Sequence, residues 1–266
     1  MITVISHFYN EEFLLPFWLH HHLRIFDHGI LIDYASTDAS VDIIKQMAPN
    51  WEIRQSRNAE FSAGECDAEV VDIENTLSGW KIALNTTEFI LYAKLKELCF
   101  LYEELYPNLV GFRTHGVTMI DSIDEAYSDI IPNIPLFFQR THGILDTYGP
   151  RGRLLHHAKN GNYEMGRHKT FHTNIQDNLD VFCLWFGWSP FRYVIDRKLQ
   201  IQTRIPQKDK DLGLGIEHII SQEDLIKKFE VLSATTENLM DNITYRQTIS
   251  DVYKFLYPEI KLRSLT

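Results

Sequence analysis

Apolar runs alternate with helical patterns over residues 1–92, and this alternation most limits the folds open to the chain. The runs at residues 2–6, 29–33 and 80–91, with a shorter one at 51–54, have the composition of buried strands. The segments between them space their apolar residues as a helix does. Strands separated by helices favour a mainly parallel sheet covered by helices on both faces, so we expect an α/β fold.

The rest of the chain predicts a helix at 95–105, a strand at 109–120 and a last helix near 243–255. Between residues 130 and 162, proline and glycine break the pattern, which is typical of loops around a site. Ser221 begins a capping-box sequence for a helix that runs through Phe229. No repeat or linker divides the chain, so we expect a single domain over residues 1–266.

Composition narrows the class of protein. The apolar runs are far shorter than the about 20 residues that a membrane-spanning helix needs. Residues 2–5 are expected to be the first core strand and not part of a leader segment. The three cysteines, Cys66, Cys99 and Cys183, lack a CxxC pair and are expected to be reduced, packed thiols. We therefore expect a cytoplasmic protein, and the net charge of −10 argues against a general nucleic-acid binder.

The charge is unevenly divided along the chain. Residues 1–130 hold 8 basic and 21 acidic side chains, whereas residues 131–266 hold 18 basic and 15 acidic side chains. An anionic ligand would therefore be drawn to groups from the second half, whatever the total charge. Random scatter of surface charge is the alternative.

Three segments, in order after successive strands, carry a resemblance to a known family. The first is Tyr9-Asn10-Glu11-Glu12, followed by Trp18-Leu19 and His22; the second is residues 32–38, close to a D-x-x-S-x-D turn; the third is residues 80–91, in the place of a strand that carries D-x-D. Together they resemble the GT-A glycosyltransferases of the family 2 type. The match covers residues 1–92, about a third of the chain.

The resemblance implies a Rossmann-like mixed, mainly parallel sheet flanked by helices, with further helices at the C-terminus. It implies transfer of a sugar, with inversion, from a nucleotide-sugar donor to a glycan, glycolipid or polysaccharide. Residues 1–92 would form the nucleotide-binding half, residues 93–220 the acceptor- and phosphate-binding half, and residues 221–266 the C-terminal helices.

Nucleotide contacts are expected beyond the carboxyl ends of the strands. Tyr9 could stack on a nucleobase, and Asp33 could accept hydrogen bonds from the base or ribose, although capping the next helix is its alternative role. The residues expected to bind the nucleotide are Tyr9, Asn10, Glu12, Asp33, Asp67, Asn85, Thr87 and Glu88.

The D-x-D motif itself is degenerate. The family's carboxylates bind a divalent cation that neutralises the departing diphosphate, but here the segment reads Asn85-Thr86-Thr87-Glu88. Glu88 alone is anionic, so we expect no tightly held metal and no cofactor. The rival expectation is a magnesium or manganese ion held weakly by Glu88, together with His218 or the phosphates of the nucleotide.

Without a metal, other positive charge must stabilise the leaving group. Basic segments at 151–157, 166–169 and 197–210, the last leading into glycines near His218, could supply it through charge-assisted contacts to phosphate. A solvated, charged loop is the alternative. The expected phosphate-binding residues are Arg167, His168, Lys208, Lys210 and His218.

Transfer also needs a base for the acceptor hydroxyl. Glu164 is the first candidate, followed by Asp121 and Asp177, and each could instead be a surface acid. Trp185 and Trp188 are the candidates for a wall that stacks on the acceptor sugar, with core packing as the alternative. The run His20-His21-His22 is not a metal site, because consecutive helical side chains point in different directions.

Two other functions stay open. The lost carboxylates also fit a non-catalytic module that binds a nucleotide or a glycan for a partner enzyme. A dinucleotide-dependent enzyme ranks last, because the turn after the first strand lacks the glycine fingerprint. The expected partners are a nucleotide-sugar donor and a glycan or lipid-linked glycan acceptor, not nucleic acid. Peripheral association with a membrane and a homodimer through the C-terminal helices remain open.

Overall fold

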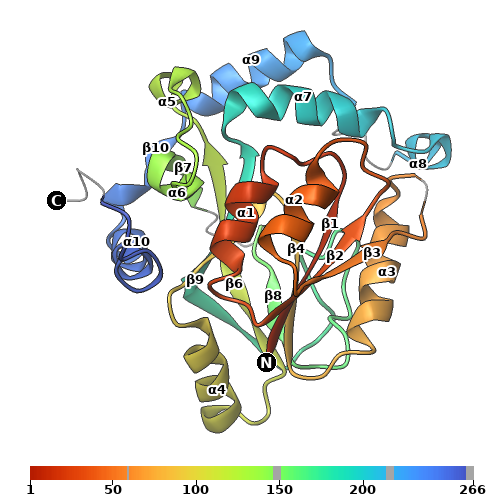
Figure 1. The fold of residues 1–266 in the computed structure, drawn as a ribbon, viewed down its shortest axis with the longest axis vertical. Coiled ribbons are helices and arrows are strands. Elements are labelled where there is room, and N and C mark those ends of the chain that lie inside the picture. The colour runs from red at the N-terminus through yellow and green to blue at the C-terminus, as the bar shows by residue number, and fades with distance from the viewer. Residues whose placement is uncertain (59, 146–150, 214–218, 262–266) are drawn as a thin grey trace.

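In the computed structural model, residues 1–58, 60–145, 151–213 and 219–261 are described, and they form one mixed sheet with helices packed around it (Figure 1). The strands are Ile2–Phe8 (β1), His28–Asp33 (β2), Glu52–Gln55 (β3), Trp80–Asn85 (β4), Glu88–Leu91 (β5), Gly111–Ile120 (β6), His142–Leu145 (β7), Leu154–His156 (β8), Ile175–Trp188 (β9) and Glu237–Asn238 (β10). The helices are Leu15–His22 (α1), Ser40–Met47 (α2), Ala63–Glu74 (α3), Leu95–Leu105 (α4), Ile123–Tyr127 (α5), Leu136–Gln139 (α6), Phe191–Gln202 (α7), Gln207–Asp211 (α8), Gln222–Ser233 (α9) and Ile243–Leu256 (α10), with the 3-10 turn Leu239–Asp241 (η2).

The sheet order is β10-β7-β6-β8-β4-β1-β2-β3, and β9 pairs with both β5 and β6. Strands β3, β2, β1 and β4 are parallel, whereas most later strands pair antiparallel, with β6 and β9 a parallel exception. The predicted α/β class, with a mixed sheet flanked by helices, is confirmed. Because β1, β2 and β4 run the same way, their carboxyl ends lie together at one edge.

Alternation along β1 builds two apolar layers. Val4 and Phe8 belong to the large core cluster on the α1 side of the sheet, whereas Ile5 packs with Val70 and Ile73 of α3 on the other. Successive strand residues face opposite sides of a sheet, so one short strand serves both layers. The interior therefore fixes the position of α3 beside the carboxyl end of β1.

Two of the three histidines on α1 lie in the core. His21 and His22 are fully buried, and His20 is partly exposed. The two ring nitrogens of His21 contact the Tyr257 hydroxyl at 2.7 Å and the Ile90 carbonyl at 2.6 Å. The indole of buried Trp18 donates to the Glu88 carbonyl at 2.9 Å. These contacts tie α1 to β5 instead of presenting a set of metal ligands.

One expected strand proves to be two. Residues 80–91 form β4 beside β1 and β5 beside β9, with Thr86 and Thr87 at the turn between them. The Glu88 carboxylate accepts from the Asn85 N–H at 2.7 Å and closes this turn. The polar segment Asn85-Thr86-Thr87-Glu88 therefore lies in the middle of residues 80–91, where the backbone leaves β1 and pairs with β9 instead.

Ser36 and Thr37 bind the loop after β1 and do not cap α2. The N-cap residue of this helix, Ala39, has no side-chain cap, but Asp38 Oδ1 accepts from the Ser40 N–H at 2.9 Å. Ser36 Oγ accepts from the Asn10 N–H at 3.1 Å, and the Thr37 N–H donates to Asn10 Oδ1 at 2.7 Å. Asn10 has a φ of 49°, which asparagine tolerates better than most residues. The contacts join the loops that follow β1 and β2.

Other local expectations are met. Ser221 caps α9, because its hydroxyl accepts from the Asp224 N–H. The three cysteines are free and buried. In the part of the chain that the structure describes, no helix is both long enough and apolar enough to cross a membrane.

Candidate functional site

A cleft of about 620 Å³ opens where β1, β2, β4 and β9 end. Its walls come from these strand ends, the start of α3, the segments at 151–153 and 165–168, and helices α7 and α9. Figure 1 shows α7 and α9 lying across the same end of the sheet. The position is the one at which open α/β sheets bind ligands.

The cleft is positively charged although the chain is acidic. Seven lysine or arginine side chains and four carboxylates line it, counting the described residues. All seven cations come from the second half of the sequence, in agreement with the uneven distribution of charge. The cations are Arg151, Arg153, Arg167, Arg197, Lys198, Arg204 and Lys228, and the carboxylates are those of Glu11, Asp67, Glu88 and Asp209.

A buried ion pair forms the floor of the cleft at the β4–β5 turn. Arg153 Nε lies 2.9 Å from both Glu88 oxygens, and its Nη2 lies 2.5 Å from Oε1. Both side chains are 1% exposed. Burial alone raises the pKa of Glu88, but the charge and hydrogen bonds of Arg153 outweigh it and the pKa is lowered. The single carboxylate of the degenerate motif is therefore ionised and engaged by an arginine.

A second arginine reaches the same turn from the other side. Arg167, 6% exposed, pairs with Asp67 of α3, and its Nη2 donates to Asn85 Oδ1 at 3.3 Å. Its Nε is buried without a hydrogen-bond partner in the described structure. The Gly166 N–H also donates to Asp67 at 2.6 Å. Asp67 therefore holds the loop that contains Gly166 and Arg167. This loop places the Arg167 guanidinium beside Asn85, the first residue of the degenerate D-x-D segment.

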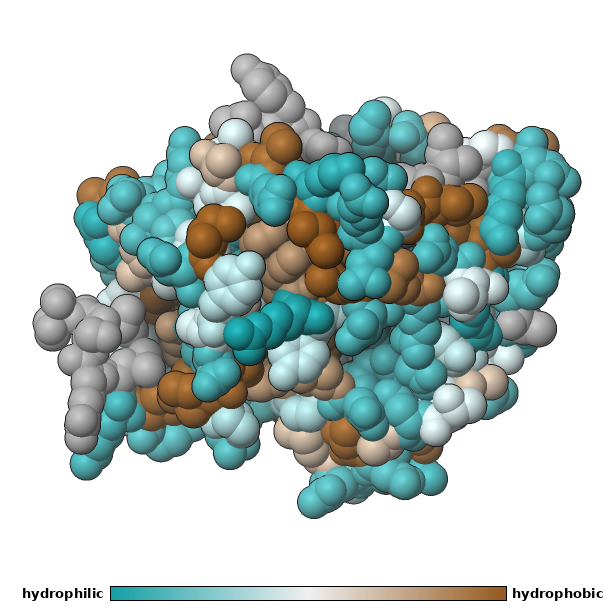
Figure 2. Space-filling model, turned by 90° about the horizontal axis from the view of Figure 1, so that it is seen from above, coloured by the Kyte–Doolittle hydropathy of each residue, from teal (hydrophilic) through white to brown (hydrophobic). Residues whose placement is uncertain are grey.

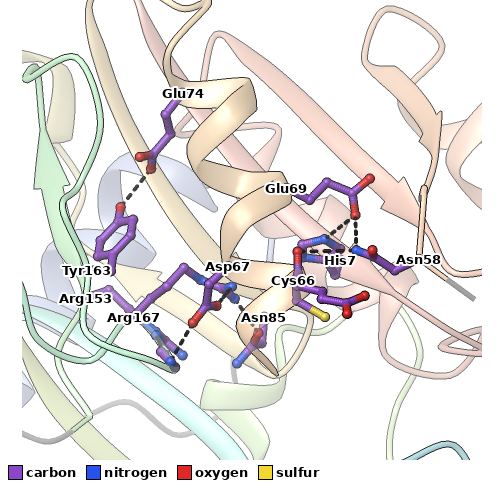
Figure 3. A network of polar contacts seen from close by, with 12 residues as sticks. His7, Asn58, Cys66, Asp67, Glu69, Glu74, Asn85, Arg153, Tyr163 and Arg167 are labelled. Carbon is purple, nitrogen blue, oxygen red and sulfur yellow. Dashed lines mark hydrogen bonds and ion pairs between the residues drawn. The ribbon is translucent and has the colours of Figure 1, made fainter. Parts of the chain in front are cut away.

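Helix α3 anchors this loop at a second point (Figure 3). The fully buried Glu74 accepts from the Tyr163 hydroxyl at 2.8 Å and from the Gly161 N–H at 2.7 Å. Asp67 and Glu74 are seven residues apart, so they lie on one face of the helix, two turns from each other. The spacing holds residues 161–167 along α3 and fixes the approach of Arg167.

His7 and Glu69 form a pair that the sequence reasoning missed. His7 Nε2 lies 3.3 Å from Glu69 Oε2 (Figure 3). Glu69 also accepts from Ser56 Oγ at 2.8 Å. Burial raises the pKa of Glu69, but these hydrogen bonds dominate and lower it to about 2. Burial is also the main cause of the lowered pKa of His7. A histidine on the α3 face of a buried strand was the signal available.

His168 lines the cleft as a neutral side chain. Its Nδ1 is buried without a hydrogen-bond partner among the described residues. Burial, followed by the neighbouring charge of Arg153, lowers the pKa of His168 to about 4. At neutral pH the ring therefore offers a hydrogen bond to an anion but not a full positive charge.

We expect the protein to lose stability as the pH falls from about 6.5 to 4. Burial lowers the pKa of His168 and of core residue His21 to about 4, whereas an unfolded histidine titrates near pH ~6.5. Between these values the unfolded chain binds protons that the folded chain cannot, so the free energy of unfolding decreases. Urea unfolding at several pH values measures the slope, and NMR titration of the imidazoles assigns it. A His168 midpoint near 6.5 would contradict this assignment.

Aromatic side chains lie at both ends of the cleft. At the β1–β2 end, the Arg204 guanidinium lies 3.8 Å from the centre of the Tyr9 ring, and its Nη1 donates to the Tyr34 carbonyl at 2.9 Å. At the β9 end stand Trp185 and Trp188. Between the two ends lie the Glu88–Arg153 and Asp67–Arg167 pairs.

The structure brings many of the predicted site residues together. Those that line the cleft are Tyr9, Asp67, Asn85, Thr87, Glu88, Arg167, His168, Trp185 and Trp188. Arg153, Arg197 and Arg204 join them, and each comes from a segment that the sequence marked as basic. Which of these residues bind a ligand stays a prediction.

Other predicted residues lie elsewhere. Asn10 and Glu12 line a neighbouring pocket of about 300 Å³ against α7. The Asp33 carboxylate accepts from the Ser36 N–H at 2.9 Å, in the turn after β2, and does not cap α2, which begins at Ser40. Lys208 pairs with Glu65 at 2.6 Å, and neither Lys208 nor Lys210 is among the described residues that line the cleft. His218 lies outside the described residues.

The three candidate bases do not line the described cleft. Glu164 is exposed, 3.9 Å from Lys169. Asp121 is fully buried, accepts from the Phe191 N–H at 2.8 Å and lies 3.4 Å from Arg140; burial raises its pKa. Asp177 pairs with Arg113 at 2.8 Å, near the opposite end of the parallel strands β6 and β9 from Trp188.

Ligands for a metal are sparse where the motif would place them. No group of three or more histidine, cysteine, aspartate or glutamate side chains in the described ranges is arranged to hold a metal ion. At the β4–β5 turn, Glu88 and the Asn85 amide oxygen would be the ligands, and both accept from arginines. A cation bound there would have to compete with these two guanidinium groups.

Comparison with known proteins gives distant structural likenesses only. No protein-family model matches the chain, and no curated protein matches it. Residues 1–349 of S. aureus TarS have a TM-score of 0.42 at 12% identity, over 98% of this chain and 75% of that one. The same protein in complex with UDP-GlcNAc scores 0.41 at 11% identity, over 98% and 76%. Glucosyl-3-phosphoglycerate synthase from Mycobacterium tuberculosis, with Mn2+, UDP and its product, scores 0.32 at 14% identity, over 44% of each chain. At these values the likeness says nothing of this chain's function.

Proposed function

We propose that the chain is a nucleotide-sugar-dependent glycosyltransferase of the GT-A type that works without a tightly held metal. The observation that carries this proposal is the excess of positive side chains in a cleft at the carboxyl ends of the strands, within a chain of net charge −10. Such a cleft attracts a diphosphate and stabilises the charge that develops as the diphosphate leaves.

Different parts of the cleft would bind the nucleobase, the diphosphate and the acceptor. Tyr9 would hold the nucleobase, because aromatic faces stack on bases. Arg167 and His168 would bind the diphosphate beside the β4–β5 turn, where family members carry the metal. Arg153 would keep Glu88 neutralised, so that this carboxylate does not repel the phosphates. Trp185 and Trp188 would face the acceptor, which is a glycan, glycolipid or polysaccharide.

A non-catalytic binding module remains the second candidate, and one observation favours it. Of the four carboxylates that line the described cleft, those of Glu11, Asp67 and Glu88 are paired with arginines. The proposed bases lie outside this lining. Such a cleft could bind a nucleotide-sugar without activating an acceptor hydroxyl.

A panel of UDP-, GDP-, CMP- and dTDP-sugars tests the proposal. We expect one base to raise the midpoint of thermal unfolding, because a ligand that binds only the folded state stabilises it. We also expect slow hydrolysis of that donor, at a rate that EDTA does not change, measured by release of the nucleoside diphosphate or monophosphate.

Each other outcome is informative. Strict dependence on manganese would refute the metal-free part of the proposal. Binding without hydrolysis or transfer, over a range of glycan acceptors, would favour the binding module. If no nucleotide shifts the unfolding midpoint, the cleft is not a nucleotide site.

A further inference from the structure

Two indole rings and three cationic side chains form the end of the cleft nearest α7 and α9, which we call the tryptophan end. The Arg151 guanidinium lies 3.9 Å from the centre of the Trp185 ring. The Lys198 ammonium lies 4.5 Å, and that of Lys228 5.5 Å, from the Trp188 ring. These distances are within the range of cation–π contacts. Three positive charges therefore gather over two aromatic faces.

The tryptophan end is built on rigid elements. Trp185 pairs with Glu88 across the β5–β9 ladder, and Trp188 is 6% exposed. Lys198 comes from α7 and Lys228 from α9. The two helices pack together through Phe191 of α7 and Phe229 of α9, whose rings stack with centres 3.6 Å apart. The packing of these helices fixes the stems of the lysines relative to the indoles, which lowers the entropy cost of binding a ligand between them.

Three of the four carboxylates that line the described cleft are paired with arginines other than Arg151. Glu11 pairs with Arg197 at 2.6 Å, Glu88 with Arg153 and Asp67 with Arg167. In the described part of the chain, the Lys228 ammonium contacts no carboxylate. Those three acids therefore do not neutralise the Lys228 ammonium.

The chemistry of the tryptophan end fits a sugar that carries negative charge. An indole face packs against the C–H groups of a pyranose ring, as aromatic walls do with apolar surfaces. A guanidinium stacked on an indole keeps its in-plane N–H groups directed away from the ring, where they can bind a carboxylate or phosphate. Figure 2, seen from the side of α7 and α9, shows hydrophilic side chains spread among apolar ones over this face.

We propose that the tryptophan end binds an anionic glycan, which carries carboxylate or phosphate groups, as the acceptor. This inference rests on the proposed function in assigning the glycan the role of acceptor. The anionic groups would contact Arg151, Lys198 and Lys228, while one sugar ring packs against Trp185, which is less buried than Trp188. The diphosphate of the donor would lie apart, beside Arg167 and His168.

Binding of three oligomers of equal length tests the inference directly. The probes are an oligogalacturonate, an oligomer of glycerol phosphate and a neutral malto-oligosaccharide, followed by calorimetry and tryptophan fluorescence. We expect one or both anionic oligomers to bind about tenfold more tightly than the neutral one, because charged hydrogen bonds add to stacking. The two anionic probes distinguish carboxylate from phosphate. Equal affinity for all three oligomers overturns the proposal.

A matched pair of lysines on α9 supplies the control. Lys228→Gln should weaken binding of the preferred anionic oligomer about fivefold and reduce its dependence on salt. Lys227→Gln should change neither, because Lys227 pairs with Glu223 at 2.7 Å and does not line the cleft. Both lysines are exposed, so neither change threatens the fold. Equal losses in the two variants would overturn the assignment of charge to this end.

Nucleotide binding, measured on the same samples, separates the two proposals. If a nucleotide binds and the oligomers show no preference for charge, the inference fails and the proposed function stands. If the anionic oligomer binds with the expected dependence on Lys228 but no nucleotide does, the glycan site stands and the acceptor role falls. If both bind, addition of donor should extend the anionic oligomer and leave the neutral one largely unchanged.

Discussion

Replacing Arg167 with alanine is expected to lower turnover of the preferred donor by about 100-fold or more. The side chain reaches both Asp67 and Asn85 at the β4–β5 turn, and its buried Nε has no partner among the described residues. A guanidinium in this place would bind phosphate oxygens more strongly as charge builds up on the leaving group. Initial rates of donor hydrolysis, with and without an acceptor, measure the loss.

Arg113→Ala is the matched control for Arg167→Ala. Arg113 also pairs with an aspartate, at 2.8 Å, but it lies near the amino ends of β6 and β9, away from the cleft. Its loss should leave the rate unchanged. Because Arg167→Ala leaves Asp67 partly buried without its partner, the double variant Asp67→Asn, Arg167→Ala separates folding from function. A rate within threefold of wild type in either cleft variant would remove Arg167 from the phosphate site.

The first part of the fold could be predicted because its signals are local. The apolar runs of β1 and β2 and the polar residues that follow them lie within a few positions of one another, so composition and period identify them. The edge where these strands end then follows from the parallel arrangement. The sequence therefore predicted a site at this edge, and the structure has a cleft there that is lined by basic side chains from the second half.

What the sequence could not show depends on distant partners. The division of residues 80–91 into β4 and β5 depends on Glu88, whose arginine partner lies 65 positions later, and on β9, which pairs with β5. The partner of His7, Glu69, is 62 positions away. Lys208 was expected to bind the phosphates of the donor, but in the structure it forms an ion pair with Glu65 of α3. Such pairings are set by tertiary packing and leave no local pattern.

Removing the positive partner of the buried ion pair should have the largest effect on stability. We expect Arg153→Met to lower the free energy of unfolding by about 3–5 kcal/mol, because it leaves an uncompensated carboxylate at Glu88, which is 1% exposed. A natural domain has only about 5–15 kcal/mol in total. Urea unfolding followed by circular dichroism measures the change. Wild-type stability in this variant would show that Arg153 is not the counter-charge of Glu88.

The double variant Glu88→Gln, Arg153→Met should recover much of this loss, because a neutral amide is far cheaper to bury than an unpaired charge. Its loss should therefore be smaller than the sum of the single losses. Arg57→Met, which breaks the exposed pair with Asp72, should leave stability within experimental error.

The pH dependence of stability tests the Glu88–Arg153 pair separately. Because the pKa of Glu88 is lowered in the folded state, its contribution is complete above the unfolded value of about 4.5 and is lost as the pH falls below that value. The wild-type protein should lose this part of its free energy of unfolding in acid. The double variant has no carboxylate at position 88 to protonate and should not.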